Sequence, residues 1–223
     1  MELQMEKHKT VLGLLHSKEA SKVCDGLNKL ETLAKSNPEI VNETVGYPQI
    51  DEHGYLNRSL KIKDAPMASA ISLWTLCWRA KTQGICPAKL RIADYFWNCF
   101  FHPIFSPKWL SALTELKHVI VMKTPLYEKI WWNLCELIHI EKLEFRHRSL
   151  FNLRDAITEL SKLQELEVIA WDLKTLPSSF APLQKLRRLK IQCEGKAIKQ
   201  FPVGVIALEN LEELILTNSY MTI

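Results

Sequence analysis

Apolar residues recur every 23 to 25 residues through the second half of the chain. Each repeat has three apolar positions, its first, fourth and sixth, in the pattern L-x-x-L-x-L. First positions are Leu116, Ile140, Leu163, Leu186 and Leu211; fourth positions are Val119, Leu143, Leu166, Leu189 and Leu214; sixth positions are Val121, Phe145, Val168, Ile191 and Leu216. At 47% apolar composition, all fifteen would be apolar by chance about once in a hundred thousand trials, so the repeat is not accidental.

Each repeat predicts one short strand over its fourth to sixth positions. Side chains alternate between the two faces of a strand, so Leu166 and Val168 point inward while Glu165 and Glu167 point outward. One repeat cannot bury its own apolar face, and successive repeats must therefore stack. The pattern predicts a parallel sheet within an α/β fold.

One segment resembles a known family. Residues 173–189, LKTLPSSFAPLQKLRRL, are similar to the bacterial-type, LP-containing leucine-rich repeats of about 23 residues. The resemblance implies an α/β leucine-rich repeat solenoid with a parallel β-sheet on its concave face, and a role in recognition. Position nine departs from the Asn that many members place there, since this chain has Thr124, Arg148, Trp171, Glu194 and Ser219.

The first half of the chain predicts helices instead of repeats. Apolar residues at three- and four-residue spacing indicate helices over 3–16, 17–35 and 66–83, with Ser17 as N-cap of the second and Gly84 ending the third of these. A short helix should follow Asn37-Pro38 and end at Gly46, and the D-E-H-G sequence that follows predicts a hairpin or irregular turn.

These patterns predict three parts. Residues 1–63 form a helical segment with a small turn or hairpin. Residues 64–112 form a helical and aromatic capping segment with an irregular first coil, in which Leu90 takes the strand position of Val119. Residues 113–223 form about five leucine-rich repeats, the last one incomplete. A repeat stack needs its apolar end covered, so the mainly helical N-terminal part is interpreted as a cap.

The outward positions of the sheet are the candidate protein-binding site. It comprises Ile120, Met122, Lys142, Glu144, Arg146, Glu165, Glu167, Ile169, Trp171, Arg188, Lys190, Gln192 and Ile215. Two interpretations remain open: a solvated ladder of salt bridges, which the charge pattern favours, or a partner footprint. Trp171 is either the anchor of that footprint or a core residue at a coil corner.

Other chemistry finds little support in the sequence. A net charge of +4 with interleaved signs argues against a nucleic-acid surface, and no apolar run or secretory signal indicates membrane insertion or export. The six cysteines and seven histidines lack metal-ligand spacing, and no catalytic or cofactor motif occurs, so we expect no enzyme, metal or cofactor.

The expected function is binding to a protein partner, by a cytoplasmic bacterial regulator or by an effector translocated into a host cytosol. Two alternatives stay open. The chain could be an enzyme with an unrecognised site in its first 112 residues. It could also be a structural subunit that associates through the C-terminal edge, residues 211–223, where we expect an exposed strand and core end.

Overall fold

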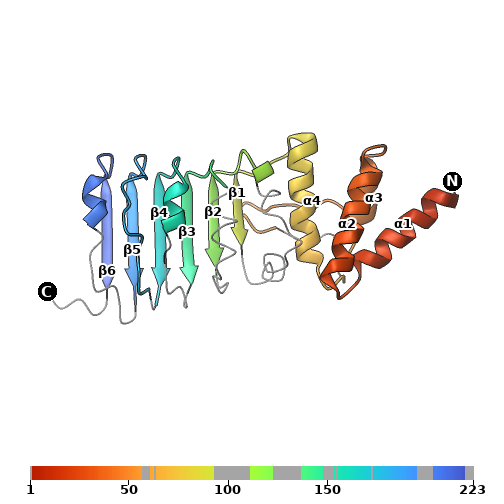
Figure 1. Ribbon diagram of the computed structural model, residues 1–223, viewed down its shortest axis with the longest axis horizontal. Coiled ribbons are helices and arrows are strands. Elements are labelled where there is room, and N and C mark those ends of the chain that lie inside the picture. Colours follow the sequence, from red (N-terminus) through yellow and green to blue (C-terminus); the bar gives the residue numbers. More distant parts are fainter. Residues whose placement is uncertain are drawn as a thin grey trace. The chain divides into compact units, whose positions relative to one another are not determined.

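The chain divides into two compact units. The structure is a computed structural model, and it describes residues 2–56, 61–62, 64–92, 111–122, 137–147, 153, 155–171, 173–194 and 203–218. The first unit comprises Met1–Cys86 and Asn98–Ala112; the second comprises Pro87–Trp97 and Leu113–Ile223. Figure 1 gives their elements in chain order.

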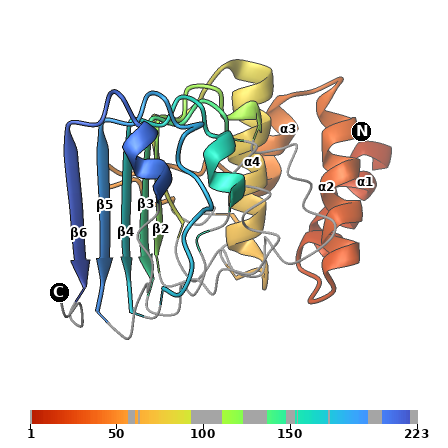
Figure 2. The same cartoon turned by 60° about the vertical axis from the view of Figure 1, so that its left-hand side comes forward.

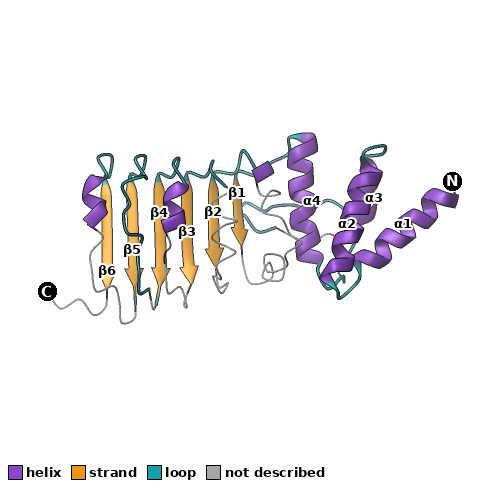
Figure 3. Ribbon diagram, viewed as in Figure 1, coloured by secondary structure: helices purple, strands orange, loops and turns teal. Residues whose placement is uncertain are grey.

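The first unit is helical. Its elements are α1 (Glu2–Leu15), α2 (Ala20–Ala34), α3 (Glu39–Val45) and α4 (Ala68–Gln83), drawn in purple in Figure 3. Their apolar faces meet in one core that contains Leu15, Leu27, Val41 and Ile71. The four helices predicted from the sequence are thereby confirmed. Within the described residues, no helix is both long and apolar enough to cross a lipid bilayer.

Helix ends follow the sequence signals in part. Gly84 ends α4 with a left-handed φ of 68°, a conformation that favours glycine, as predicted. The prediction of Ser17 as N-cap of α2 is wrong, because that helix begins at Ala20 and its N-cap residue is Glu19. The Ser17 hydroxyl instead accepts a bond from the Glu19 N–H at 3.0 Å, which fixes the turn between α1 and α2.

Of the predicted hairpin or irregular turn, the structure has the turn. A single antiparallel bridge joins Ile50 to Leu56. The Asp51 carboxylate accepts bonds from the backbone N–H groups of His53 and Tyr55, at 2.9 and 2.8 Å. The Asp51 side chain therefore holds the turn together through hydrogen bonds to the backbone, in place of a longer strand ladder.

The second unit is built on one sheet of six parallel strands. These are β1 (Lys89–Ile92), β2 (His118–Met122), β3 (Lys142–His147), β4 (Glu165–Ala170), β5 (Arg188–Cys193) and β6 (Glu213–Asn218). Their order in the sheet is their order in the chain, as Figure 3 shows for the strands in orange. Each strand therefore pairs only with its neighbours in the sequence, which is the arrangement that stacked repeats produce.

The register of the strands matches the sequence repeat. Equivalent fourth positions lie opposite one another, from Leu90 and Val119 to Leu189 and Leu214. The first, fourth and sixth positions of β2 to β5 are at most 1% exposed, and burying each such side chain contributes roughly 1.5 to 3 kcal/mol. The predicted parallel sheet and its pairing, including the strand position of Leu90, are confirmed.

Two backbone features repeat with the same period. The Glu141 carbonyl accepts bonds from the N–H groups of Gln164 and Glu165, at 2.7 and 3.0 Å, and Ala88, Lys117, Gln164 and Arg187 do the same for the next strand. A four-residue turn also precedes each of the strands β2 to β6, and it is closed by a bond such as the one from the Leu163 N–H to the Leu160 carbonyl at 2.9 Å. These bonds satisfy the backbone where the chain enters the sheet.

The return segments contain short 3₁₀ helices, η3 (Asp155–Glu159) and η4 (Val203–Ala207), which lie on one side of the sheet in Figure 2. The η4 helix follows Pro202, as the missing N–H of proline favours. At Gly204, an added Cβ would lie 2.8 Å from the Phe180 backbone nitrogen, so neighbouring coils touch there.

Candidate functional site

The outward side chains of β2 to β6, here called the charged face, form the candidate site. Strand alternation exposes one set of side chains: in β4, Glu165, Glu167 and Ile169 are half-buried while the residues between them are buried. Eight charged residues share the face. The cations Lys142, Arg146, Arg188 and Lys190 balance the anions Glu144, Glu165, Glu167 and Glu213, so the formal charge is 4 − 4 = 0.

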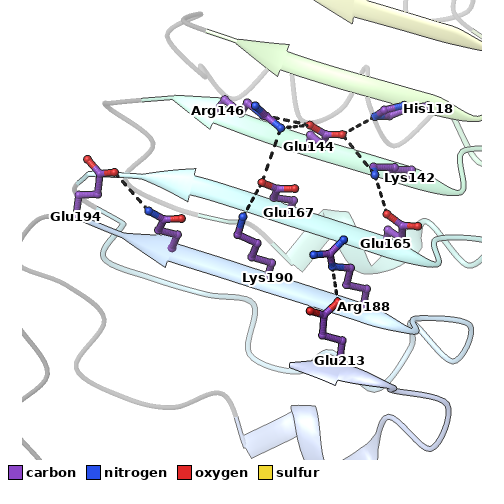
Figure 4. Close-up of polar contacts among 11 residues, drawn as sticks. His118, Lys142, Glu144, Arg146, Glu165, Glu167, Arg188, Lys190, Glu194 and Glu213 are labelled. Atoms are coloured by element: carbon purple, nitrogen blue, oxygen red, sulfur yellow. Dashed lines mark hydrogen bonds and ion pairs between the residues drawn. The ribbon is translucent and has the colours of Figure 1, made fainter. Parts of the chain in front are cut away.

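Glu144 is the centre of the face, and its side chain is only 6% exposed. The His118 Nε2–H donates to Glu144 Oε1 at 2.8 Å, because a carboxylate can only accept. Arg146 donates to Glu144 Oε2 through Nη2 at 2.8 Å and through Nε at 3.1 Å. Lys142 Nζ adds an ion pair at 3.6 Å, so three side chains surround one buried carboxylate (Figure 4).

These contacts change the acidity of Glu144. The hydrogen bond from His118 is the largest cause, and the nearby charges of Arg146, His118 and Lys142 act in the same direction. Burial acts in the opposite direction, because it disfavours the ionised form. The result is a Glu144 pKa lowered from 4.5 to about 2, so the carboxylate is ionised throughout the physiological range.

The remaining charges pair across neighbouring strands, as Figure 4 shows. The ion pairs are Lys142 Nζ to Glu165 Oε2 at 2.8 Å, Lys190 Nζ to Glu167 Oε1 at 3.1 Å, and Arg188 Nε to Glu213 Oε2 at 2.6 Å. The last contact lacks hydrogen-bond geometry at Nε. Arg146 Nη2 also lies 3.9 Å from Glu167, so the ion pairs around Glu144 and the Lys190–Glu167 pair form one ladder. The salt-bridge interpretation therefore describes the charged residues of this face well.

Two residues predicted as surface contacts are buried. Ile120 is 3% exposed and Glu144 is 5% exposed. Both occupy outward positions, but Ile120 lies between Arg91 and Glu144 in the register, and these long side chains stand on either side of it. The prediction that they offer surface to a partner is wrong, and Glu144 has a structural role instead.

The apolar and neutral residues of the face lie in the remaining outward positions. Met122, Ile169, Gln192 and Ile215 are half-buried. Trp171, one residue beyond β4, is 42% exposed, so its side chain is not a core residue. The register places Met122, Arg146, Ile169 and Gln192 opposite one another in one row across four strands.

Two residues outside the predicted candidate set contact members of it. His118 is the donor that holds Glu144, and Arg91 of β1 reaches the face, where its Nη1 lies 3.6 Å from the Met122 sulfur. The signal for both was present, because each occupies an outward repeat position. Their roles became visible only when the strand register placed them beside Glu144 and Ile120.

The C-terminal edge is more exposed than the equivalent positions inside the sheet. Leu214 is 42% exposed, whereas its counterpart Leu189 is fully buried. Leu211 and Leu216 are half-buried. Residues 219–223, which complete the edge predicted as a contact, lie outside the described residues.

The first unit, where the alternative enzyme hypothesis places an active site, contains two buried thiols and a groove among its described residues. Burial raises the pKa of the Cys24 thiol to about 11 and raises that of Cys77 further, which disfavours the nucleophilic thiolate in both. A groove of about 430 Å³ lies between α1 and α2, and Lys7, Val11, Lys29 and Leu33 are among its lining residues. Its described lining includes no carboxylate, imidazole or thiol, so it offers no acid, base or nucleophile of those types.

Comparison with known proteins gives a distant likeness among solved structures. No family model matches the chain, and no curated protein matches it. Among solved structures, a leucine-rich repeat protein of Leptospira interrogans aligns over 62% of this chain and 39% of its own, with 17% identity and a TM-score of 0.41. The alignment thus spans well under half of that protein, and the architecture described above rests on the strand pairing of this chain alone.

Proposed function

We propose that the chain is a leucine-rich repeat protein that binds a protein partner through the charged face. The observation that carries this proposal is the face itself: consecutive strands present their outward side chains on one rigid surface, and Trp171 stands exposed beside it. Exposed aromatic side chains next to arginines are typical anchors of protein interfaces.

The charge pattern supports a selective surface. Because the eight charges pair with one another, the face does not attract polyanions as an uncompensated basic patch would. A partner must instead fit a fixed pattern of charged and apolar side chains, which favours specificity over general adhesion. A cytoplasmic bacterial regulator or a translocated effector is the setting that the repeat style suggests, and it stays a prediction.

The substitution Ile169→Arg tests the proposal. Ile169 lies in the middle of the face, and an arginine there adds bulk and an uncompensated charge without opening the core, since the side chain points outward. The full-length protein serves as bait in native lysate, the retained protein is identified and purified, and its Kd is measured. We expect Ile169→Arg to weaken binding about tenfold or more at an unchanged melting temperature.

The matched control is Ile206→Arg. Ile206 is 82% exposed and lies in η4, away from the face, so the same chemical change should leave the Kd unaltered. Equal binding by the wild type and Ile169→Arg would contradict the assignment of the face. Loss of binding in both variants would indicate a general charge effect instead.

A further inference from the structure

We infer that the face binds an amphipathic α-helix of the partner, laid across the strands along the row Met122–Arg146–Ile169–Gln192 with Trp171 at its flank. This inference rests on the proposed function and names the partner element. It follows from the way charge is distributed over the face, from the spacing of the row and from the exposure of its members.

The other outward rows are occupied by ion pairs. Lys142, Glu165, Arg188 and Glu213 alternate in sign along one row, and each contacts a neighbour of opposite charge. Covering such pairs removes water from charges that already have partners, so it returns little free energy. The row that contains Met122 and Ile169 has apolar surface at these two positions, so contact there brings a hydrophobic gain, and Arg146 is the one charged residue in its span from Met122 to Gln192.

The spacing of this row matches a helix. Neighbouring strands are about 4.8 Å apart, so Met122 and Ile169, two strands apart, are separated by roughly 9.6 Å. A helix rises 1.5 Å per residue, and positions i and i+7 lie about 10.5 Å apart on one side. Positions i+3 and i+4 then fall over the strand between them, which carries Arg146.

The chemistry of the matching helix follows from these positions. Apolar side chains at i and i+7 would meet Met122 and Ile169, and the second is the one nearer to Trp171, which is exposed two residues after Ile169 in the chain. A carboxylate at i+3 or i+4 would meet Arg146. With 48% of its side chain exposed, Arg146 is the most accessible of the four cations of the face, and it is fixed in place by Glu144. The face therefore selects the pattern apolar, acidic, apolar.

A displayed library of 18-residue helical peptides tests the inference. Positions i, i+3, i+4 and i+7 are randomised on an Ala, Gln and Lys background, and selection uses the full-length protein. We expect enrichment of large apolar residues at i and i+7 and of Asp or Glu at i+3 or i+4. The best peptide, made synthetically, should lose about tenfold or more in affinity when its acid is changed to Lys or when the protein carries Trp171→Ala.

The control variant is Tyr47→Ala, which removes an aromatic side chain of similar exposure, 45%, from the first unit and should leave peptide affinity unchanged. The inference is overturned if no helical peptide is enriched, if basic residues are selected at the middle positions, or if Trp171→Ala binds as well as the wild type. If Ile169→Arg still abolishes binding of the native partner in that case, the proposed function stands and only the helix is lost. If the peptide selection fails and Ile169→Arg also binds the native partner as well as the wild type does, the face is not the binding surface.

Discussion

Acidification from about pH 6 to about pH 2 is expected to remove about 3 kcal/mol of stability through Glu144. The carboxylate has a pKa of about 2 in the folded protein and 4.5 as its ordinary value. Each pKa unit corresponds to about 1.4 kcal/mol. Because the folded pKa is the lower one, the stabilisation is complete above about pH 5 and is lost as the pH falls toward 2.

The measurement is urea unfolding of the wild type and of Glu144→Gln at several pH values. At pH 7 the variant should be less stable, since a neutral amide cannot replace the ionised partner of His118 and Arg146. The difference between the two proteins should shrink as the pH falls toward 2 and vanish below it, because the wild-type carboxyl is half protonated at pH 2 and largely neutral only below that pH. A pH-independent difference between them would contradict this role for Glu144.

Glu165→Gln is the matched control. Glu165 also pairs with Lys142, at 2.8 Å, but its side chain is 41% exposed. Exposed pairs contribute about 1 kcal/mol or less, so this variant should differ little from the wild type at any pH. Comparing the two variants separates the stability contributed by the buried Glu144 carboxylate from that contributed by the exposed ion pairs around it.

Gly204→Ala is expected to destabilise the second unit by about 1 to 3 kcal/mol. The added Cβ would lie 2.6 Å from the Ser179 hydroxyl and 2.8 Å from both the Ser179 Cα and the Phe180 nitrogen. Two of these are backbone atoms, so a side-chain rotation cannot relieve the clash and the coils must move apart. Thermal unfolding followed by circular dichroism measures the change.

Gly13→Ala provides the opposite expectation. Gly13 lies in α1, and an added Cβ would meet no atom within 4 Å. Alanine favours a helix by up to about 1 kcal/mol over glycine, so this variant should be as stable as the wild type or more so. A similar loss in both variants would mean that the contact at Gly204 does not hold the coils together.

The sheet could be predicted from the sequence because the apolar residues on its inward face recur at a regular spacing. Leu143, Leu166 and Leu189 occur at a fixed spacing, and the inward column they form needs no knowledge of loops. The return segments were not predicted in the same detail, and the structure describes the short 3₁₀ helices η3 and η4 in two of them. The start of α2 was also misplaced, because Ser17 caps a turn instead of the helix.

The sequence predicted which residues of the candidate site lie on the outward side of the strands, but it did not predict how deeply each side chain is buried. Alternation alone assigns Ile120 and Glu144 to the outward side, yet their burial depends on side chains from adjacent strands. Two outward glutamates, Glu144 and Glu167, face each other in the register with Arg146 close to both. The aligned repeats were enough to predict that these residues lie close together. The contact between His118 and Glu144 could not be predicted in this way, because it depends on the side-chain conformation of His118.

The most direct test of the account is radical footprinting of the full-length protein with and without its captured partner. Trp171 and Tyr47 are similarly exposed, at 42% and 45%, and both react readily with hydroxyl radicals. Binding through the charged face predicts that Trp171 becomes protected in the complex while Tyr47 keeps its reactivity. Protection of Tyr47 with unchanged modification of Trp171 would contradict the account and place the binding surface on the first unit.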